Sequence, residues 1–378
     1  MQIRRYIQKQ IEADLGKGKA LLLFGARQVG KTTLVNNLLR PELDIYLNAD
    51  QAETRDLLET TNLSRLSSLV RKYERVVIDE AQRIKGVGLT LKILIDNFKD
   101  KDLIVTGSSS FELANKVNEE LTGRKFNYHL LPIAELELAA SGKTIVELGE
   151  EREERLILGS YPEVVVATSL EDKQRAIKLI TESYIFKDIL TLGLVKDTGN
   201  LERLLRAIAF QIGSEVSLSE LATVSDLDRK TIARYLNICE QAFIIFALPP
   251  LRRNRRSAIS KMKKYYFYDL GIRNALVRNF NLLEARDDVG ALWENYCIIE
   301  RMKRNSNLGL SPETFFLRDY SGKEVDYIEY DNDKYQALEF KYRADRPPKG
   351  TTEMLKDHTG QEVSLSVVNK DNILDHIL

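Results

Sequence analysis

The stretch GARQVGKT at residues 25–32 constrains the fold of this chain more than any other feature of its sequence. It satisfies the pattern G-x-x-x-x-G-K-[S/T], follows the apolar run Ala20–Phe24, and precedes a helical pattern that begins near Lys31. The glycines permit backbone angles that aim successive amides at one point, and the helix that follows adds a positive dipole. The stretch therefore predicts a phosphate-binding loop in an α/β domain. A glycine-rich strand-to-helix turn without a ligand is the alternative.

Individual positions in this loop have expected roles toward a nucleoside triphosphate. Lys31 is expected to reach the β- and γ-phosphates, and the hydroxyl of Thr32 is expected to bind Mg²⁺. Arg27 is expected either to neutralise phosphate charge or to face solvent. The predicted nucleotide-binding residues are Gly25, Ala26, Arg27, Gln28, Val29, Gly30, Lys31, Thr32 and Thr33.

Two further apolar runs end in polar side chains. RVVIDEAQ ends a strand pattern with Asp79 and Glu80. We expect Asp79 to hold the Mg²⁺ shell and Glu80 to polarise the attacking water, although an exposed acid pair can close any strand. DLIVTGSSS brings Thr106 or Ser108 toward the γ-phosphate or the attacking water. Because strands and helices alternate, we predict a parallel sheet whose carboxyl edge gathers these groups.

Charge and cysteine content exclude several classes of protein. The chain has 56 Lys and Arg against 56 Asp and Glu, so contact with nucleic acid would require a local basic patch. Two distant cysteines, Cys239 and Cys297, make no disulfide framework. No apolar run approaches the roughly 18 to 20 residues of a membrane helix, and the amino terminus lacks the apolar core of a signal peptide. These observations predict a cytoplasmic protein without a membrane segment.

The sequence pattern changes in the middle of the chain. ELGEEREERL, residues 147–156, is acidic and helical, and it is expected to be a solvated linker or the face of a lid. From Leu201 onward, three helical segments precede two apolar strands. This order outlines a winged helix.

Two parts of this predicted winged helix are candidates for contact with double-stranded DNA. Lys230, Arg234 and Asn237, within residues 230–237, recur at helical spacing on one outward face, as a helix in the major groove requires. RRNRRSAISKMKK, residues 252–264, has seven basic residues and no acidic one. A solvated loop, or a module that packs on another protein, is the alternative.

Near the end of the chain, VDYIEYDNDKYQALEFKYR at residues 325–343 has the pattern of two strands. If the Asn-Asp pair between them forms a two-residue turn, Asp326 lies opposite Glu339, and Lys341 shares their face. Like charges placed in this way are destabilising unless a cation such as Mg²⁺ or Mn²⁺ separates them. The pattern predicts a second metal site, with an ordinary charged hairpin face as the alternative.

The order of these motifs resembles the additional-strand class of P-loop ATPases, specifically prokaryotic and archaeal AAA-type ATPases with a carboxy-terminal restriction-endonuclease-like domain of unknown function. The matching landmarks are GARQVGKTTL, VVIDEAQ, TGSSS, LTGRKFNYHLLPIAELE, GSYPEV, KYYFYDLGIRNAL, WENY, EVDYI and LEFKY. The resemblance implies an α/β P-loop ATPase core with a parallel sheet, followed by a winged helix and a PD-(D/E)xK-like α/β domain. The expected boundaries are 1–146 for the core, 147–200 for a helical lid or linker, 201–270 for the winged helix and 271–378 for the last domain.

The resemblance also implies roles for single residues. Arg124 in LTGR falls before the last core strand and is expected to sense the γ-phosphate, with a surface arginine as the alternative. Glu294 is implied as a third acid beside Asp326 and Glu339, with Lys341 orienting water or steadying the phosphate. No proline precedes Asp326, a departure that leaves the four chemical positions filled.

These patterns together predict Mg²⁺-dependent ATP hydrolysis that drives a conformational switch on DNA or a protein partner. An ATP-regulated, metal-dependent nuclease is the alternative. The Asn-Lys-x-Asp signature of GTPases is absent, whereas oligomeric state and any DNA sequence stay open. The predicted catalytic residues are Lys31, Glu80, Ser108 and Arg124. The predicted metal ligands are Thr32 and Asp79 for the Mg²⁺ of the ATP site, and Glu294, Asp326 and Glu339 for a second Mg²⁺ or Mn²⁺.

Overall fold

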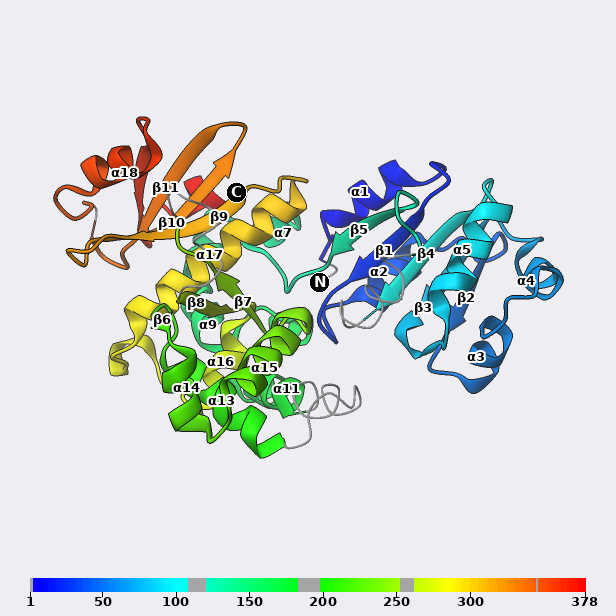
Figure 1. The fold of residues 1–378 in the computed structure, drawn as a ribbon, viewed down its shortest axis with the longest axis horizontal. Coiled ribbons are helices and arrows are strands. Elements are labelled where there is room, and N and C mark those ends of the chain that lie inside the picture. The colour runs from blue at the N-terminus through cyan, green and yellow to red at the C-terminus, as the bar shows by residue number, and fades with distance from the viewer. Residues whose placement is uncertain (1–2, 108–119, 183–197, 252–261, 345) are drawn as a thin grey trace. The chain divides into compact units, whose positions relative to one another are not determined.

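The computed structural model describes residues 3–107, 120–182, 198–251, 262–344 and 346–378 (Figure 1). The chain divides into two compact units, each described here by itself. The nucleotide-loop unit comprises Arg4–Leu131 with Gln241–Phe243. The second unit comprises Met1–Ile3, Pro132–Glu240 and Ile244–Leu378.

The nucleotide-loop unit is built on a five-stranded sheet of order β2-β3-β4-β1-β5, in which neighbouring strands are parallel. This confirms the predicted parallel sheet, and it places β4 between the strand before the loop and the strand that ends in Asp79. β1, β3 and most of β4 are buried apolar runs, as strands covered on both faces must be. The elements are α1 (Ile7–Asp14), β1 (Ala20–Phe24), α2 (Lys31–Leu38), β2 (Asp44–Asn48), α3 (Ala52–Leu58), α4 (Leu63–Val70), β3 (Arg75–Asp79), the 3-10 helix η1 (Ala81–Arg83), α5 (Val87–Asn97), β4 (Asp102–Gly107) and β5 (Lys125–His129).

The second unit combines helices with two separate sheets. Its first part contains α7 (Glu135–Ala140), α8 (Ile145–Glu150), α9 (Arg152–Leu158), α10 (Pro162–Val166), α11 (Leu170–Glu182), α13 (Thr198–Phe210), β6 (Glu215–Val216), α14 (Leu218–Ser225), α15 (Arg229–Gln241), β7 (Ile245–Leu248), β8 (Lys263–Phe267) and α16 (Leu270–Val277). The three strands form an antiparallel sheet of order β6-β8-β7. In α15, Ile232, Leu236 and Cys239 are buried, while Lys230, Arg234 and Asn237 are exposed, as the helical spacing predicts.

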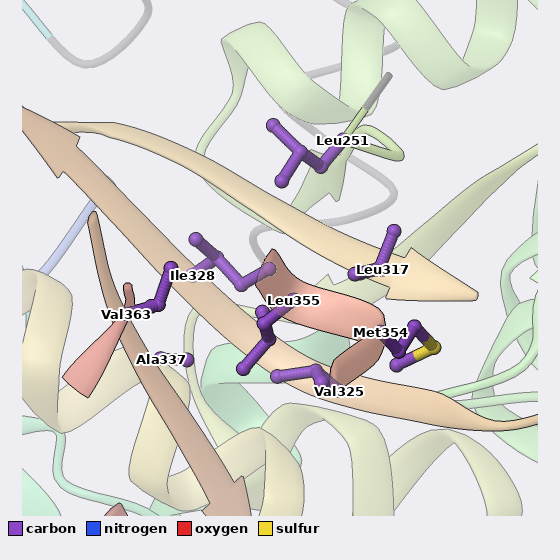
Figure 2. Close-up of a cluster of buried hydrophobic side chains, with 8 residues drawn as sticks. All are labelled: Leu251, Leu317, Val325, Ile328, Ala337, Met354, Leu355 and Val363. Carbon is purple, nitrogen blue, oxygen red and sulfur yellow. The ribbon is translucent and has the colours of Figure 1, made fainter. Parts of the chain in front are cut away.

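The remaining part of the second unit contains the four-stranded sheet. Its elements are η4 (Leu283–Ala285), α17 (Val289–Asn307), β9 (Glu313–Arg318), β10 (Glu324–Asp331), β11 (Lys334–Phe340), α18 (Thr351–Thr359), β12 (Ser364–Val368) and α19 (Leu374–Ile377). The strand order is β12-β11-β10-β9, with β11 and β12 parallel and the other pairs antiparallel. Met354 and Leu355 of α18 pack against Val325, Ile328 and Ala337 of this sheet, and Figure 2 shows this cluster.

The β10–β11 hairpin has the predicted register. Asn332 and Asp333 have φ values of +49° and +60°, as a two-residue hairpin turn requires, and Tyr327 pairs with Leu338. The pairing of β10 with β9 shifts between Val325 and Ile328, which is a β-bulge. Bulges re-aim side chains, and this one lies at the position of Asp326.

Residues 147–156 were expected to be a solvated linker or the face of a lid, and the structure shows that only part of the stretch is exposed. Leu148 of α8 is buried, and so are the side chains of Arg152 and Arg155 in α9. Nε of Arg152 lies 2.9 Å from a carboxylate oxygen of the buried Glu135, and Nη2 of Arg155 lies 3.0 Å from the same oxygen. The many acidic residues of this stretch suggested a surface position. Its two arginines instead hold it in the core, because they pair with the buried Glu135.

Two sequence landmarks, GSYPEV and KYYFYDLGIRNAL, meet in the core of the second unit. Gly159 has φ +82°, and a Cβ at this position would lie 1.9 Å from Oδ1 of Asp269. Asp269 caps α16 by accepting from the amide of Gly271 at 2.9 Å, and it also accepts from the amide of Ser160 at 2.7 Å. Burial raises the pKa of Asp269 to about 6, partly offset by these amide bonds. Both landmarks therefore have a structural explanation, because a glycine and a buried acid fit each other.

Among the described residues, no helix has the length and apolar composition that crossing a membrane requires.

Candidate functional site

The carboxyl edge of the parallel sheet brings three predicted residues together around Asp79. Asp79 ends β3 and is 2% exposed. Its Oδ2 accepts a hydrogen bond from the hydroxyl of Thr32 at 2.9 Å, and its Oδ1 accepts one from the hydroxyl of Thr106. The register explains this meeting, since β4 pairs with both β3 and β1 and all three strands run in the same direction.

Tyr46 is a fourth member of this group, and sequence reasoning missed it. Its hydroxyl donates to Oδ2 of Asp79. Burial raises the pKa of Tyr46, and the hydrogen bond to Asp79 raises it further, so the phenol stays a donor. Strand alternation could have indicated this residue. Asn48 pairs with Asp79, and Tyr46, two residues before Asn48, lies on the same side of the sheet as this pair.

Lys31 lies at the buried base of the loop. It is 5% exposed, and its Nζ donates to the carbonyl oxygens of Gly25 and Ala26, both at 2.9 Å. Gly30, the N-cap of α2, provides no side-chain cap for the helix, so the first amides of α2 are directed toward the loop. An ammonium and a helix amino terminus therefore converge on one loop, which is the arrangement that binds phosphate. Of the other loop residues, Arg27 is half-buried, and Thr32 and Thr33 are exposed.

Gly25 fits its position because the chain comes close on one side. A Cβ on Gly25 would lie 2.3 Å from the carbonyl oxygen of Leu130, a backbone atom that a rotamer change cannot move. Leu130 is held there, since its amide donates to the carbonyl of Phe24 at 2.7 Å. The guanidinium of Arg5 donates to the carbonyls of Val29, at 2.8 Å, and Leu131. The phosphate loop and the segment that leaves this unit are thus in direct contact.

Glu80 follows Asp79 in a left-handed backbone conformation, with φ +54° and ψ +40°. Its amide donates to Oγ1 of Thr106 at 3.2 Å, and its carboxylate accepts from the side-chain amide of Gln82. The reversal of the chain at Glu80 turns this half-buried carboxylate away from the direction of β3. Glu80 therefore shares Thr106 with Asp79 through its amide, while its carboxylate has a separate donor in Gln82.

One predicted catalytic residue, Arg124, is not brought to this site. Ser108 lies outside the described residues. Arg124 precedes β5 and accepts from the amide of Ala20, the first residue of β1, whereas the loop follows Phe24 at the other end of that strand. Its side chain forms an ion pair with Asp96 at 3.0 Å, with both partners partly exposed. Arg124 was a wrong prediction for this site, because the strand that follows it runs toward the loop and not away from it.

A second group of carboxylates lies in the other unit. Oxygens of Glu294 in α17 and of Glu324 and Asp326 in β10 all lie within 4.8 Å of one another. We call these three residues the acid cluster. Glu294 and Asp326 were predicted, but Glu324 was missed, although alternation along β10 places residues 324 and 326 on the same face of the strand.

Glu339 and Lys341 lie beside the acid cluster. Nζ of Lys341 is 2.7 Å from Oε1 of Glu339 and 3.7 Å from Oδ2 of Asp326. Glu339 is 2% exposed, and within the described residues its Oε2 is a buried acceptor with no hydrogen-bond donor. The predicted neighbourhood of Asp326, Glu339 and Lys341 is therefore present, with an unpaired carboxylate oxygen in it.

Lys264 ends the basic stretch 252–264, which was expected to contact DNA or to be a solvated loop, but its side chain is buried. The side chain is 1% exposed, and Nζ lies 3.1 Å from Oε1 of Glu294 and also binds Glu324. The hydroxyl of Tyr266, on the same strand, donates to Glu294 as well. Alternation in β8 sends these two side chains inward, which a count of charges could not reveal. Residues 252–261 lie outside the described part of the chain.

Burial and mutual repulsion act on the carboxylates of the acid cluster and on Glu339. Burial, and then the charge of Asp326, raise the pKa of Glu294 to about 7. Burial also raises the pKa of Asp326, and burial together with Asp326 raises that of Glu339. These carboxylates repel one another in a poorly solvated place, so oxygen-preferring Mg²⁺ or Mn²⁺ fits them chemically.

Three family models match successive parts of the chain. Residues 17–139 match the family described as AAA domain. Residues 149–283 match a domain of unknown function, DUF8612, and residues 289–376 match another, DUF4143.

Several proteins align with much of the chain. The uncharacterised protein Rv2008c of Mycobacterium tuberculosis is 28% identical over 301 residues, covering 78% of this chain and 65% of that protein. The chain thus spans just under two thirds of the length of this relative. The uncharacterised protein MJ1544 of Methanocaldococcus jannaschii is 20% identical over 389 residues, covering 96% of this chain and 85% of that protein. Among solved structures, a Walker-type ATPase of Pyrococcus abyssi gives a TM-score of 0.49 at 16% identity, covering 71% of this chain and 94% of that one.

Proposed function

We propose that the P-loop AAA-type ATPase domain formed by residues 17–139 binds ATP with Mg²⁺, hydrolyses it, and acts as a conformational switch on DNA or a protein partner. The observation that carries the proposal is the position of Lys31 beneath the loop 25–32, where its Nζ donates to the carbonyl of Gly25, together with the hydrogen bond between Thr32 and Asp79. A cationic loop base and a hydroxyl–carboxylate pair are what a magnesium–triphosphate complex requires.

Binding would exchange internal bonds of the loop for bonds to phosphate. Nζ of Lys31 would leave the carbonyls of Gly25 and Ala26 and donate to phosphate oxygens, which carry more negative charge. Thr32 and Asp79 would hold the Mg²⁺, which when bound neutralises phosphate charge. Tyr46 and Thr106 fix the Asp79 carboxylate through their hydroxyls, so these residues act as positioning groups.

Glu80 is the candidate general base for the attacking water. It is adjacent to Asp79, and its own amide is fixed by Thr106, so its carboxylate is positioned by the same group of residues. Gln82 donates to this carboxylate and would have to release it, or share it with water, during hydrolysis.

The contact between the loop 25–32 and the segment Leu130–Leu131 supports a role as a conformational switch. Leu130 lies against Gly25, and Arg5 joins the carbonyls of Val29 and Leu131. A change in the loop on nucleotide binding would therefore act directly on the residues that continue into Pro132. This is a local mechanism for passing the nucleotide state along the chain.

Helices α13–α15 and the sheet beside them suggest duplex DNA as the partner of the switch. Three helices with a sheet of order β6-β8-β7 agree with a winged helix, and α15 exposes Lys230, Arg234 and Asn237 on one face. Such a face suits phosphate and base-edge contacts in duplex DNA. A protein surface is the other partner class.

The test of the ATPase proposal is a calorimetric titration of the full chain with ATP, with and without Mg²⁺. We expect saturable binding that weakens by at least about tenfold when Mg²⁺ is removed, because the phosphate charge then lacks its counter-ion. Titration with AMP is the control, since it lacks the phosphates that Lys31 is placed to contact. Absence of Mg²⁺-dependent ATP binding would contradict the proposal.

A metal-dependent nuclease is the second candidate, favoured by one observation. Oε2 of Glu339 is a buried acceptor with no donor among the described residues, next to the acid cluster and Lys341. A metal-bound water would donate to this oxygen, and a lysine beside carboxylates can steady a developing phosphate charge.

Cutting of supercoiled plasmid in Mn²⁺ tests this second candidate. We expect Asp326→Ala to lower the cutting rate by about 10²-fold or more, because it removes a buried cluster carboxylate. Asp331→Ala is the matched control, since Asp331 is an exposed acid on the same strand. Equal rates in the wild type and Asp326→Ala would assign the cutting to a contaminant and remove the candidate.

A further inference from the structure

We propose that Lys264 is an internal cation that keeps the acid cluster closed to metal, and that a divalent cation such as Mn²⁺ binds Glu294, Glu324 and Asp326 only by displacing it. The inference rests on the metal site of the second candidate function. It adds a ligand, Glu324, and a competitor, Lys264, that no sequence pattern indicates.

The position of Lys264 relative to the carboxylates carries the inference. Nζ lies 3.1 Å from Oε1 of Glu294 and makes a hydrogen bond to Glu324, so the ammonium occupies the space between two of the three acids. Oxygens of the three acids lie within 4.8 Å of one another, a separation that oxygens around one cation can have when each ligand is about 2.0 to 2.6 Å away. A lysine and a metal ion would therefore use the same oxygens.

Because both are positively charged, the ammonium of Lys264 and a divalent cation cannot occupy the acid cluster at the same time. The ammonium of Lys264 and a divalent ion sharing Glu294 and Glu324 would be like charges a few ångströms apart, in a place where Lys264 is 1% exposed and solvent screens little. Lys341 is a poorer competitor, because it lies outside the cluster, 3.7 Å from Asp326, and it is 40% exposed. The divalent ion must displace Lys264 and can leave Lys341 in place.

A permanent salt bridge is the opposing explanation, and the unpaired oxygen of Glu339 argues against it. Buried ion pairs that serve stability have their remaining lone pairs satisfied. Here Oε2 of Glu339 is left without a donor among the described residues, although Nζ of Lys341 lies 2.7 Å from Oε1 of the same carboxylate. The carboxylates around Asp326 therefore include an acceptor oxygen that neither lysine satisfies and that a water bound to a cation would satisfy.

Displacing Lys264 from the acid cluster would also affect β8, since Lys264 and Tyr266 of this strand both bind Glu294. β8 is the central strand of the β6-β8-β7 sheet, next to the α13–α15 region. Binding equilibria are reciprocal, so a partner that draws β8 away from α17 would raise the affinity for metal, and metal would favour that partner-bound state.

The experiment measures free Mn²⁺ by electron paramagnetic resonance in titrations of the full chain. We expect Lys264→Met to bind Mn²⁺ at least about tenfold more tightly than the wild type, and Lys264→Arg, which keeps the charge, to bind as weakly as the wild type. Lys264→Gln is the second neutral variant, for use where Lys264→Met does not fold. Lys303→Met is the matched control: Lys303 is also a buried lysine paired with an acid, 2.8 Å from Glu300, outside the acid cluster.

The outcomes separate this inference from the function on which it rests. Tighter binding in the neutral Lys264 variants, lost when Asp326→Asn is added, supports it. Equal affinity in the wild type and the neutral variants overturns it while leaving the metal site intact. Absence of Mn²⁺ binding in every variant overturns both. Tighter binding without any plasmid cutting supports the inference and removes the nuclease.

Discussion

Replacing Lys31 with alanine is expected to lower the rate of ATP hydrolysis by about 10³-fold and to weaken ATP binding. Lys31 provides the ammonium at the buried base of the loop, where the low exposure of the site strengthens its attraction for phosphate. The developing negative charge on the transferred phosphoryl group loses this partner in the variant. Steady-state phosphate release, measured at saturating Mg²⁺ and over a range of ATP concentrations, separates the effect on kcat from that on KM.

The control for Lys31→Ala is Lys92→Ala in the same unit. Lys92 is a partly exposed lysine that pairs with Glu120 at 3.3 Å, so its loss is expected to leave hydrolysis unchanged. Because Lys31 also donates to two loop carbonyls, far-ultraviolet circular dichroism must establish that the variant is folded. A folded Lys31→Ala chain that hydrolyses ATP at more than a tenth of the wild-type rate would contradict the assignment of this loop.

Glu80→Gln is expected to lower kcat by about 10²- to 10³-fold while leaving ATP affinity close to that of the wild type. The amide cannot take a proton from water, but it has nearly the shape of the carboxylate. Because binding uses the loop, Thr32 and Asp79, the variant should accumulate bound ATP. The checks are single-turnover hydrolysis and a calorimetric titration on the same preparation.

Glu74→Gln is the matched control for Glu80→Gln. Glu74 is an exposed glutamate just before β3, 2.9 Å from Arg40, and its neutralisation is expected to change neither rate nor affinity. If Glu80→Gln lowered affinity and rate together, Glu80 would be a binding or structural residue. If it changed neither, the base would have to be sought elsewhere.

The loop and the group of side chains around Asp79 were largely predictable because the information for them is local. The loop pattern, Asp79 and Glu80 each sit at the end of a recognisable strand, and a parallel sheet necessarily brings such ends to one edge. Tyr46 was harder to find, because its role depends on which strand lies beside β3, and the sequence does not state that order. The register of the β10–β11 hairpin was also predictable, because a two-residue turn fixes which residues oppose each other.

The errors came from features that depend on contacts between distant parts of the chain. Lys264 looked like one more exposed base in a basic stretch, but it pairs with acids 30 and 60 residues away in sequence. Arg152 and Arg155 looked like part of a charged linker, but they pair with Glu135. Composition records the number of charges and not their partners, so buried ion pairs are the features that it conceals most completely.

The hydrogen bonds of Arg5 show which residues the nucleotide-loop unit needs at its two ends. The AAA match begins at residue 17, yet Arg5 binds the loop carbonyl of Val29, and Ile7 and Ile11 of α1 are buried. A fragment trimmed to the matched residues would expose the apolar surface that α1 covers and leave the loop without this support. Laboratory work on an isolated piece of this unit should therefore include residues 4–131, so that Arg5 and both carbonyls that it binds are retained.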